Sequence, residues 1–567
     1  MKYNKFSRRM FLQGSGAVLA IPFLESLAPS EARAQAAEPV KRYLGHQMNF
    51  DCGHSRNWLP KLTTLANPME IPGTPQRGSF ERLSSIMGSK PQLSPILNAS
   101  MNPFISRMMI YKGLDIISHG VHDNGTLYYL GNMWSVGYGS LNIGEVAGHN
   151  PMTESIHSLI ARNPKFDPAK RQVVHMREGA VAVRDALGNV VPKYSSGGWS
   201  ALNIYNALFN SGAYPESGAA PISHPRRDLL TRVLGDYSRI INGRQIGTSD
   251  KIVLTSALDA IADLQRGLEV QVTNACRHRG FENNPNVTLG DLRLDDTLSW
   301  SNYIKLVVAL FQCDITRAIT IGAGPNNFED WTGLPTQDYH GNVTHAPNFV
   351  SGGKENWQLM GELYGRHYRN FVAPLLTALD GCIDPANNKS FLNNGLAHLS
   401  VESNYPHRQI NIPTVTIGDL NGTLPTGYMV NYTDPSRPLN RNGRDPLDQL
   451  SFSDNPAEAT DQYTDRHTYD YYGIPYQRFL VTVLQAMGLS PSDYEDPTIN
   501  QHVLNRSDSI YGAQNNGITN LGGYGVCSFE KISEVMKDGG LWYWHQERMK
   551  NYNWNYYKFP VPLPPKV

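Results

Sequence analysis

The sequence predicts an α/β protein with a mostly parallel sheet flanked by helices. Short apolar runs, typical of buried strands, alternate with longer stretches in which apolar residues recur every three or four positions, as on one face of a helix. The runs are residues 43–50, 108–114, 172–176, 318–322, 396–401 and 414–417, and the longer stretches are 249–272, 297–313, 355–379 and 476–487. Strands separated by helices favour a parallel sheet, in which ligands bind beyond the carboxyl ends of the strands.

The first element, residues 1–34, has the three-part pattern of a twin-arginine export signal. Arg8 and Arg9 are followed by the modestly apolar run 14–24, which is too short to span a bilayer, and residues 32–34 (Ala-Arg-Ala) offer small side chains to a signal peptidase. We therefore expect a periplasmic or extracellular protein whose partner during export is the twin-arginine translocase. This route carries folded proteins, often with an ion or cofactor already inserted, which favours a prosthetic ion.

After the signal, we expect residues 40–490 to form one α/β domain and residues 491–567 to form a C-terminal extension rich in aromatic residues and proline. The chain of 567 residues is long enough for a large domain with additions. The stretch 423–461, rich in Pro, Asn, Asp and Arg, is typical of a long insertion loop. We expect the extension to pack on the domain, because exposed aromatic residues at its density promote aggregation. Three tryptophans of the extension, Trp542, Trp544 and Trp554, are expected to be largely buried against the domain.

Charge and cysteine usage exclude several classes of function. Lys+Arg and Asp+Glu both number 50 without a long charged run, so binding of nucleic acid is not expected. No apolar run of about 18 residues or more follows the export signal, so no stable membrane span is expected in the mature chain. The five cysteines contain no Cys-x-x-Cys pair, and the Gly-x-Gly sequences lack a third glycine, so no nucleotide, haem or Fe–S cofactor is expected. One or two disulfides can form, with the pairing open.

Polar residues gather after the first two predicted strands. Asp51 follows the first, and His119, His122, Asp123 and Thr126 lie in one loop after the second. Because carboxyl ends of parallel strands share one edge of a sheet, these side chains are candidates for a common site.

Two later strands are followed by the same residue types. His340 and His345 come some twenty residues after the strand 318–322, and Glu402 and His407 follow the next predicted strand. Neutral imidazole and carboxylate oxygen are ligands of zinc and similar divalent metals, which proteins often bind with residues from separate loops. A single histidine is more often a surface or hydrogen-bonded residue, but histidines after three strands favour a shared site for a divalent metal.

Several segments resemble the HXXSHH family of twin-arginine-exported bacterial proteins of unknown function. The resemblance is carried by the export signal with residues 21–25, by residues 111–114 and 119–131, and by the segments 313–317 and 340–345. The last of these, His-Gly-Asn-Val-Thr-His, keeps the first and last histidines of the motif and has Val343 and Thr344 at its serine and middle histidine. The family is distantly similar to the alkaline-phosphatase and sulfatase superfamily.

The resemblance implies an alkaline-phosphatase-like fold with one or two metal ions at the carboxyl edge of the sheet. The implied metal ligands are Asp51, His119, His340, His345, Glu402 and His407. In the loop 119–126, Thr126 is a conceivable nucleophile, and His122 or Asp123 is placed to move a proton. The sulfatase Cys-x-Pro-x-Arg sequence and the phosphatase Asp-Ser-Ala sequence are absent, which favours a metal-bound hydroxide as the attacking group.

The expected function is a secreted metal-dependent hydrolase of a phosphate, sulfate or related ester, on a small molecule or a polymer. The alternative is a noncatalytic periplasmic binding or assembly partner of another exported protein, which the altered motif favours. A third interpretation is a carbohydrate or polymer binder that uses the aromatic extension. Asp314 and Arg317, three residues apart at a predicted helix end, are interpreted as a structural ion pair.

Overall fold

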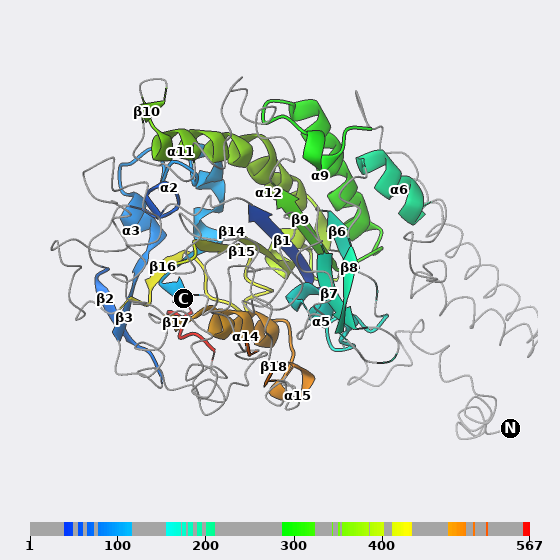
Figure 1. The fold of residues 1–567 in the computed structure, drawn as a ribbon. Coiled ribbons are helices and arrows are strands. Elements are labelled where there is room, and N and C mark those ends of the chain that lie inside the picture. The colour runs from blue at the N-terminus through cyan, green and yellow to red at the C-terminus, as the bar shows by residue number, and fades with distance from the viewer. Residues whose placement is uncertain are drawn as a thin grey trace, which may run out of the picture.

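The computed structural model describes the chain in segments that together make up its core. These are residues 39–48, 55–60, 65–72, 77–115, 155–169, 171, 173–176, 180–184, 187, 190–194, 200–209, 286–323, 343, 350–351, 354–384, 386–401, 411–433, 474–494, 503–504, 518–519 and 560–566. A central sheet with helices on both faces makes the fold α/β, as the sequence predicts (Figure 1).

The central sheet has nine strands in the order β2-β3-β16-β4-β15-β14-β1-β9-β6. In chain order they are β1 (Arg42–Met48), β2 (Asn67–Glu70), β3 (Arg77–Arg82), β4 (Met108–Lys112), β6 (Val174–Met176), β9 (Ala318–Ala323), β14 (Gly395–Val401), β15 (Thr414–Ile417) and β16 (Tyr428–Asn431). β1 lies between β14 and β9 and is parallel to both. β6 is parallel to β9, and β16 is parallel to β4.

The sheet is mixed, which corrects the prediction of a mostly parallel one. β15 is antiparallel to both of its neighbours, β14 and β4, and β3 is antiparallel to β2 and β16. A parallel return needs a crossover of about a dozen residues or more, usually with a helix, and the link 402–413 is at that lower limit. A second correction concerns the predicted insertion loop 423–461, because its residues 428–431 form β16 inside the sheet.

Two helical layers cover the sheet, one on each face (Figure 1). On one side lie α9 (Thr297–Gln312), α11 (Asn356–His367), the π-helical η5 (Tyr368–Val372) and α12 (Ala373–Asp380), and on the other lie α5 (Ile156–Arg162) and α14 (Tyr476–Ala486). The sequence predicts α9, the continuous α11–η5–α12 helix and α14 at nearly these bounds. The predicted helix 249–272 lies outside the described residues.

Smaller elements complete the described fold. The helices are α2 (Ser55–Trp58), α3 (Leu83–Met87), η2 (Ala99–Arg107), α6 (Ala201–Phe209), η3 (Leu289–Asp291), α13 (Phe391–Asn394) and α15 (Pro491–Tyr494). The two-stranded pairs are β5 (Leu114–Asp115) with β17 (Ile474–Pro475), β7 (Ala180–Arg184) with β8 (Val190–Tyr194), β10 (Val350–Ser351) with β11 (Lys354–Glu355), β12 (Ile383–Asp384) with β13 (Lys389–Ser390), and β18 (Val503–Leu504) with β19 (Ile518–Thr519). Among the residues that the structure describes, no helix is long and apolar enough to cross a bilayer.

The turn between α9 and β9 confirms the predicted structural ion pair. Arg317 Nε donates to Asp314 Oδ1 at 3.1 Å. Asp314 has a positive φ of 50°, a conformation that Asp and Asn tolerate better than most residues. Arg171 Nη2 also donates to Asp314 Oδ2 at 2.7 Å, and Arg171 Nη1 pairs with the buried Asp167 at 2.5 Å. These charges fix the entry into β9 at the amino edge of the sheet.

The end of the chain, residues 560–566, lies against α14 and β16. Arg478 Nη2 donates to the Pro560 carbonyl at 3.0 Å, and the Tyr432 hydroxyl donates to the Pro562 carbonyl at 2.9 Å. The Val561 amide donates to Thr482 Oγ1 at 2.8 Å, and Val561 is buried. Trp542, Trp544 and Trp554 lie outside the described residues, so the predicted packing of the aromatic segment itself stays a prediction.

Candidate functional site

The carboxyl ends of the central strands lie level at one edge of the sheet. Met48, the last residue of β1, pairs in register with Val401, the last residue of β14, and with Ala323, the last residue of β9. Because β15 is antiparallel to both β14 and β4, the strands β4 and β16 point the same way as β1. Neighbouring strands lie about 5 Å apart, so Val401 and Ala323 flank Met48 closely at this edge.

The predicted site residues follow these strand ends in the chain, and all of them lie outside the described residues. Asp51 comes three residues after Met48, and Glu402 directly follows Val401. The remaining predicted ligands are His119, His340, His345 and His407, and the predicted catalytic residues are His122, Asp123 and Thr126. The strands that precede these residues in the chain therefore end level with one another. The side-chain geometry of the residues themselves stays a prediction. In the part of the chain that is described, no group of three or more His, Cys, Asp or Glu side chains is placed to hold a metal ion.

One face of the sheet, the face toward α5 and α14, is lined with buried polar side chains near this edge. In a strand, alternate residues point to the same face, and residues in register share it. We call this surface the polar face and define it by Gln47 of β1, Thr320 of β9, His175 of β6, His398 and Ser400 of β14, and Thr414 and Thr416 of β15. All of them are buried, and their register places them side by side.

His398 is the centre of the polar face. Its Nδ1 lies 2.9 Å from the Tyr43 hydroxyl and its Nε2 lies 2.9 Å from the Tyr476 hydroxyl. Tyr476 in turn approaches Ser400 Oγ and Thr414 Oγ1, both at 3.4 Å. Burial lowers the pKa of His398 to about 3, so the ring is neutral at physiological pH. A neutral imidazole has one donor and one acceptor nitrogen, so one tyrosine donates to the ring and the other accepts from it.

A second histidine of the polar face, His175, lies on β6, the outermost strand of the sheet next to β9. His175 Nδ1 is 2.6 Å from Thr320 Oγ1. Its ring stacks on that of His157 of α5, with centroids 6.1 Å apart and an interplanar angle of 15°. The ring contact thus joins α5 to β6 beside the buried aliphatic side chains Ile156, Leu159 and Ile160 of the same helix.

Gln47 is the polar side chain of this face that lies nearest the end of β1. It is fully buried, and among the described residues neither its Nε2 nor its Oε1 has a hydrogen-bond partner. Its neighbours in register are the small residues Ser400 on β14 and Gly322 on β9. An unpaired buried amide lowers stability by about 1 to 3 kcal/mol, so this position is unfavourable for folding alone.

The opposite face of the sheet, which we call the apolar face, is packed against α9, α11, η5 and α12. The described residues of this layer include a histidine pair, in which His46 Nε2 lies 3.0 Å from His367 Nε2 with Trp300 and Phe371 around the rings. Burial lowers the pKa of His46 to about 3. Burial, followed by the nearby His46, holds the pKa of His367 well below its usual range. Both rings are therefore neutral core residues.

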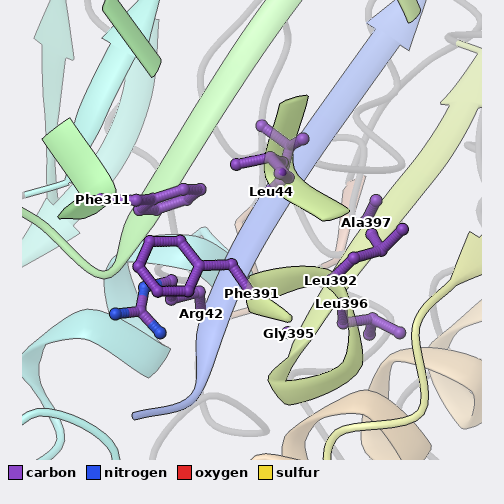
Figure 2. A pocket seen from close by; sticks show the side chains of 9 residues that line it. Arg42, Leu44, Phe311, Phe391, Leu392, Gly395, Leu396 and Ala397 are labelled. Atoms are coloured by element: carbon purple, nitrogen blue, oxygen red, sulfur yellow. The ribbon is translucent and has the colours of Figure 1, made fainter. Parts of the chain in front are cut away.

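A small cavity lies at the amino edge of the sheet, away from the strand ends that lead to the predicted residues. Figure 2 shows Arg42, Leu44, Phe311 and Phe391 around it. Its volume of about 10 Å³ is close to the lower limit for one water molecule. The Arg42 guanidinium lies 3.6 Å over the Phe391 ring and pairs with Asp384 at 3.3 Å. Among the described residues that line it, this cavity is thus bounded by a structural arginine and has room for no more than about one water molecule.

Comparison with protein-family models, curated proteins and solved structures finds no match to this chain.

The sequence reasoning missed the polar face altogether. The stretch 396–401 was interpreted as an apolar strand, although His398 and Ser400 alternate with Ala397 and Leu399 in it. A period of two between polar and apolar residues is the pattern of a strand whose faces differ.

Proposed function

We propose that this protein is an exported metal-dependent hydrolase of a phosphate, sulfate or related ester, with its site beyond the carboxyl edge of the sheet. The observation that carries the proposal is the register of Met48 with Val401 and Ala323, which brings the ends of β1, β14 and β9 level. In the chain these ends are followed by Asp51, by Glu402 and His407, and by His340 and His345. Binding beyond the carboxyl ends of strands is the general rule for sheets of this kind.

The donor set fits a divalent metal of the zinc type. The residues that would hold it are Asp51, His119, His340, His345, Glu402 and His407, which combine imidazole nitrogen with carboxylate oxygen. When bound, such an ion lowers the pKa of a coordinated water and polarises the ester group. The polar face carries buried hydrogen-bonding groups near the same edge, among them His398, whose pKa is lowered by burial so that the ring stays neutral.

The loop after β4 carries the proposed proton-transfer groups. His122 and Asp123 are the groups that we assign to moving a proton to the leaving oxygen, and Thr126 is an alternative nucleophile. The loop begins from β4, whose carboxyl end faces the same edge as that of β14 because both are antiparallel to β15.

Export by the twin-arginine route belongs to the proposal. Its support is the pattern of residues 1–34, with Arg8 and Arg9 before the apolar run. The disulfide of Cys313 supports it as well, because disulfides persist in oxidising compartments outside the cytoplasm.

The second candidate is a noncatalytic binding or assembly partner of another exported protein. Val343 favours it: this residue stands at the serine position of the HXXSHH motif and is fully buried in the hydrophobic core. A valine with no exposed surface packs and cannot serve as a reacting group, so this part of the motif has a structural role here.

The test is metal content together with ester hydrolysis of the exported protein. We expect about one or two zinc-type ions per chain and hydrolysis of at least one member of a panel of phosphate and sulfate esters at neutral pH. Glu402→Ala should lose most of the metal and the activity, because it removes a ligand directly after β14. The matched control is Glu362→Ala, which removes a half-exposed carboxylate of α11 that pairs with Lys354 and should change neither. Wild-type protein with no stoichiometric metal and no hydrolysis supports the noncatalytic candidate.

A further inference from the structure

Gln47 occupies a position on β1 that places its carboxamide next to the carboxyl edge on the polar face. It precedes Met48, the last residue of β1, and lies in register between Ser400 of β14 and Gly322 of β9. A glycine and a serine are small, so no large side chain on either neighbouring strand stands beside the carboxamide at this level.

The hydrogen-bonding capacity of Gln47 is unused in the described part of the molecule. Its side chain is fully buried, and both its Nε2 and its Oε1 lack partners there. The adjacent Ser400 directs its hydroxyl to the Pro413 carbonyl at 3.1 Å, away from any bond with Gln47. Buried polar groups in native proteins are nearly always paired, and the exceptions call for an explanation such as a ligand.

We propose that Gln47 is a ligand-binding residue whose carboxamide Nε2 donates to an anionic oxygen of the substrate or product. The inference rests on the proposed function, which places a tetrahedral phosphate or sulfate group at this edge. It goes further by assigning the ligand contact to a residue of the sheet itself rather than to the loops beyond it.

The surroundings of Gln47 favour an anion over a cation. Its neighbours on the polar face, among them Ser400, Thr414, His398 and Thr320, carry hydroxyl and imidazole groups, and none of the residues that define this face is a carboxylate. An amide that donates to a charged oxygen forms a stronger hydrogen bond than a neutral pair does. Two donor hydrogens on Nε2 suit the oxygens of a tetrahedral group.

The experiment measures inorganic phosphate binding by calorimetry and thermal unfolding for the full exported chain, loaded with zinc, and for three variants. Gln47→Met has a similar volume and no donor. We expect it to weaken phosphate binding about 10-fold or more and to raise the melting temperature by about 1 to 3 °C, because it removes an unpaired buried amide. Gln47→Glu keeps the shape and adds a negative charge, and it should abolish phosphate binding.

The matched control is Gln485→Met on α14. Gln485 Nε2 donates to the Tyr494 hydroxyl at 3.0 Å, so its loss should lower the melting temperature and leave phosphate binding unchanged. A glutamine with only a structural role at position 47 would behave like this control.

The outcomes separate this inference from the proposed function. Phosphate binding that is unchanged in Gln47→Met, or absent from the wild type, overturns the assignment of Gln47. Phosphate binding that is retained in Gln47→Glu overturns it too, and tighter zinc binding in that variant would show that the position binds a cation instead. If phosphate binds in a Gln47-dependent way while no ester is hydrolysed, the assignment stands and the hydrolase proposal fails.

Discussion

The two faces of the central sheet are built from the same strands and differ in chemistry. On β14, Ala397, Leu399 and Val401 point to the apolar face, and the alternate residues His398 and Ser400 point to the polar face. Both sets are buried. Burial of aliphatic side chains drives folding, whereas burial of polar ones costs free energy that only good hydrogen bonds offset.

The polar face is therefore not explained by stability. His398 has its hydrogen bonds with Tyr43 and Tyr476, so its burial is compensated. Gln47 has none among the described residues, and it lies at the end of the face that is closest to the proposed site. This contrast, with an unpaired buried amide at the end of the polar face, is the basis on which we propose that Gln47 takes part in binding.

The largest expected effect concerns the buried histidines of both faces. The pKa values of His46 and His398 are lowered by burial to about 3, and that of His367 is also low, whereas an unfolded histidine has a pKa of about 6.5. The unfolded chain binds protons at these rings more readily than the folded chain does. The contribution of the three neutral rings to the free energy of unfolding is therefore complete above pH ~6.5 and is lost as the pH falls from there toward ~3. We expect the free energy of unfolding to decrease by about 4 kcal/mol between pH 7.5 and 5.5, measured by urea denaturation.

The variant His398→Gln separates the contribution of the polar face to this pH dependence from that of His46 and His367 on the apolar face. It removes one imidazole ring of the polar face and keeps a donor and an acceptor. The decrease over this pH range should become about one third smaller. A free energy of unfolding that stays flat in the wild type would show that these rings are not buried as neutral groups.

The next effect compares two adjacent residues of β14. Leu399→Ala on the apolar face should lower the free energy of unfolding by about 2 to 5 kcal/mol, because it leaves a cavity in a packed core. Ser400→Ala on the polar face removes the hydrogen bond to the Pro413 carbonyl and should cost about 0.5 to 1.5 kcal/mol. Chemical denaturation of both variants measures the difference. Equal costs would mean that the two faces contribute alike to stability.

The smallest effect concerns the hydrogen bonds of His398. Tyr43→Phe and Tyr476→Phe should each lower the free energy of unfolding by about 1 kcal/mol, and the double variant should deviate from additivity by about 0.5 kcal/mol or more because both hydroxyls bind one ring. Tyr111→Phe is the control, since the Tyr111 hydroxyl contacts Thr416 at 3.3 Å instead. Strict additivity of Tyr43 and Tyr476 would contradict a shared network.

The local sequence predicts the elements of this fold better than their arrangement. In α11–η5–α12 and in α14, apolar residues recur every three or four positions along a continuous stretch of chain. The predicted helices therefore lie at nearly the observed positions. The direction of β15 depends on pairing between strands that are distant in the chain, and β16 lies within a stretch rich in turn-forming residues; neither is determined by local pattern. The role of Gln47 is visible only once β14 and β9 are placed beside β1.

We propose that ligands bind beyond the carboxyl edge of the sheet, at the ends of β1, β14 and β9. X-ray diffraction from crystals of the exported protein, recorded with anomalous scattering at the zinc absorption edge, tests it most directly. We expect one or two peaks just beyond the ends of β1 and β14, within about 2.0 to 2.2 Å of imidazole or carboxylate atoms. Peaks confined to other surfaces, or no peak at full occupancy in zinc-loaded protein, would contradict it.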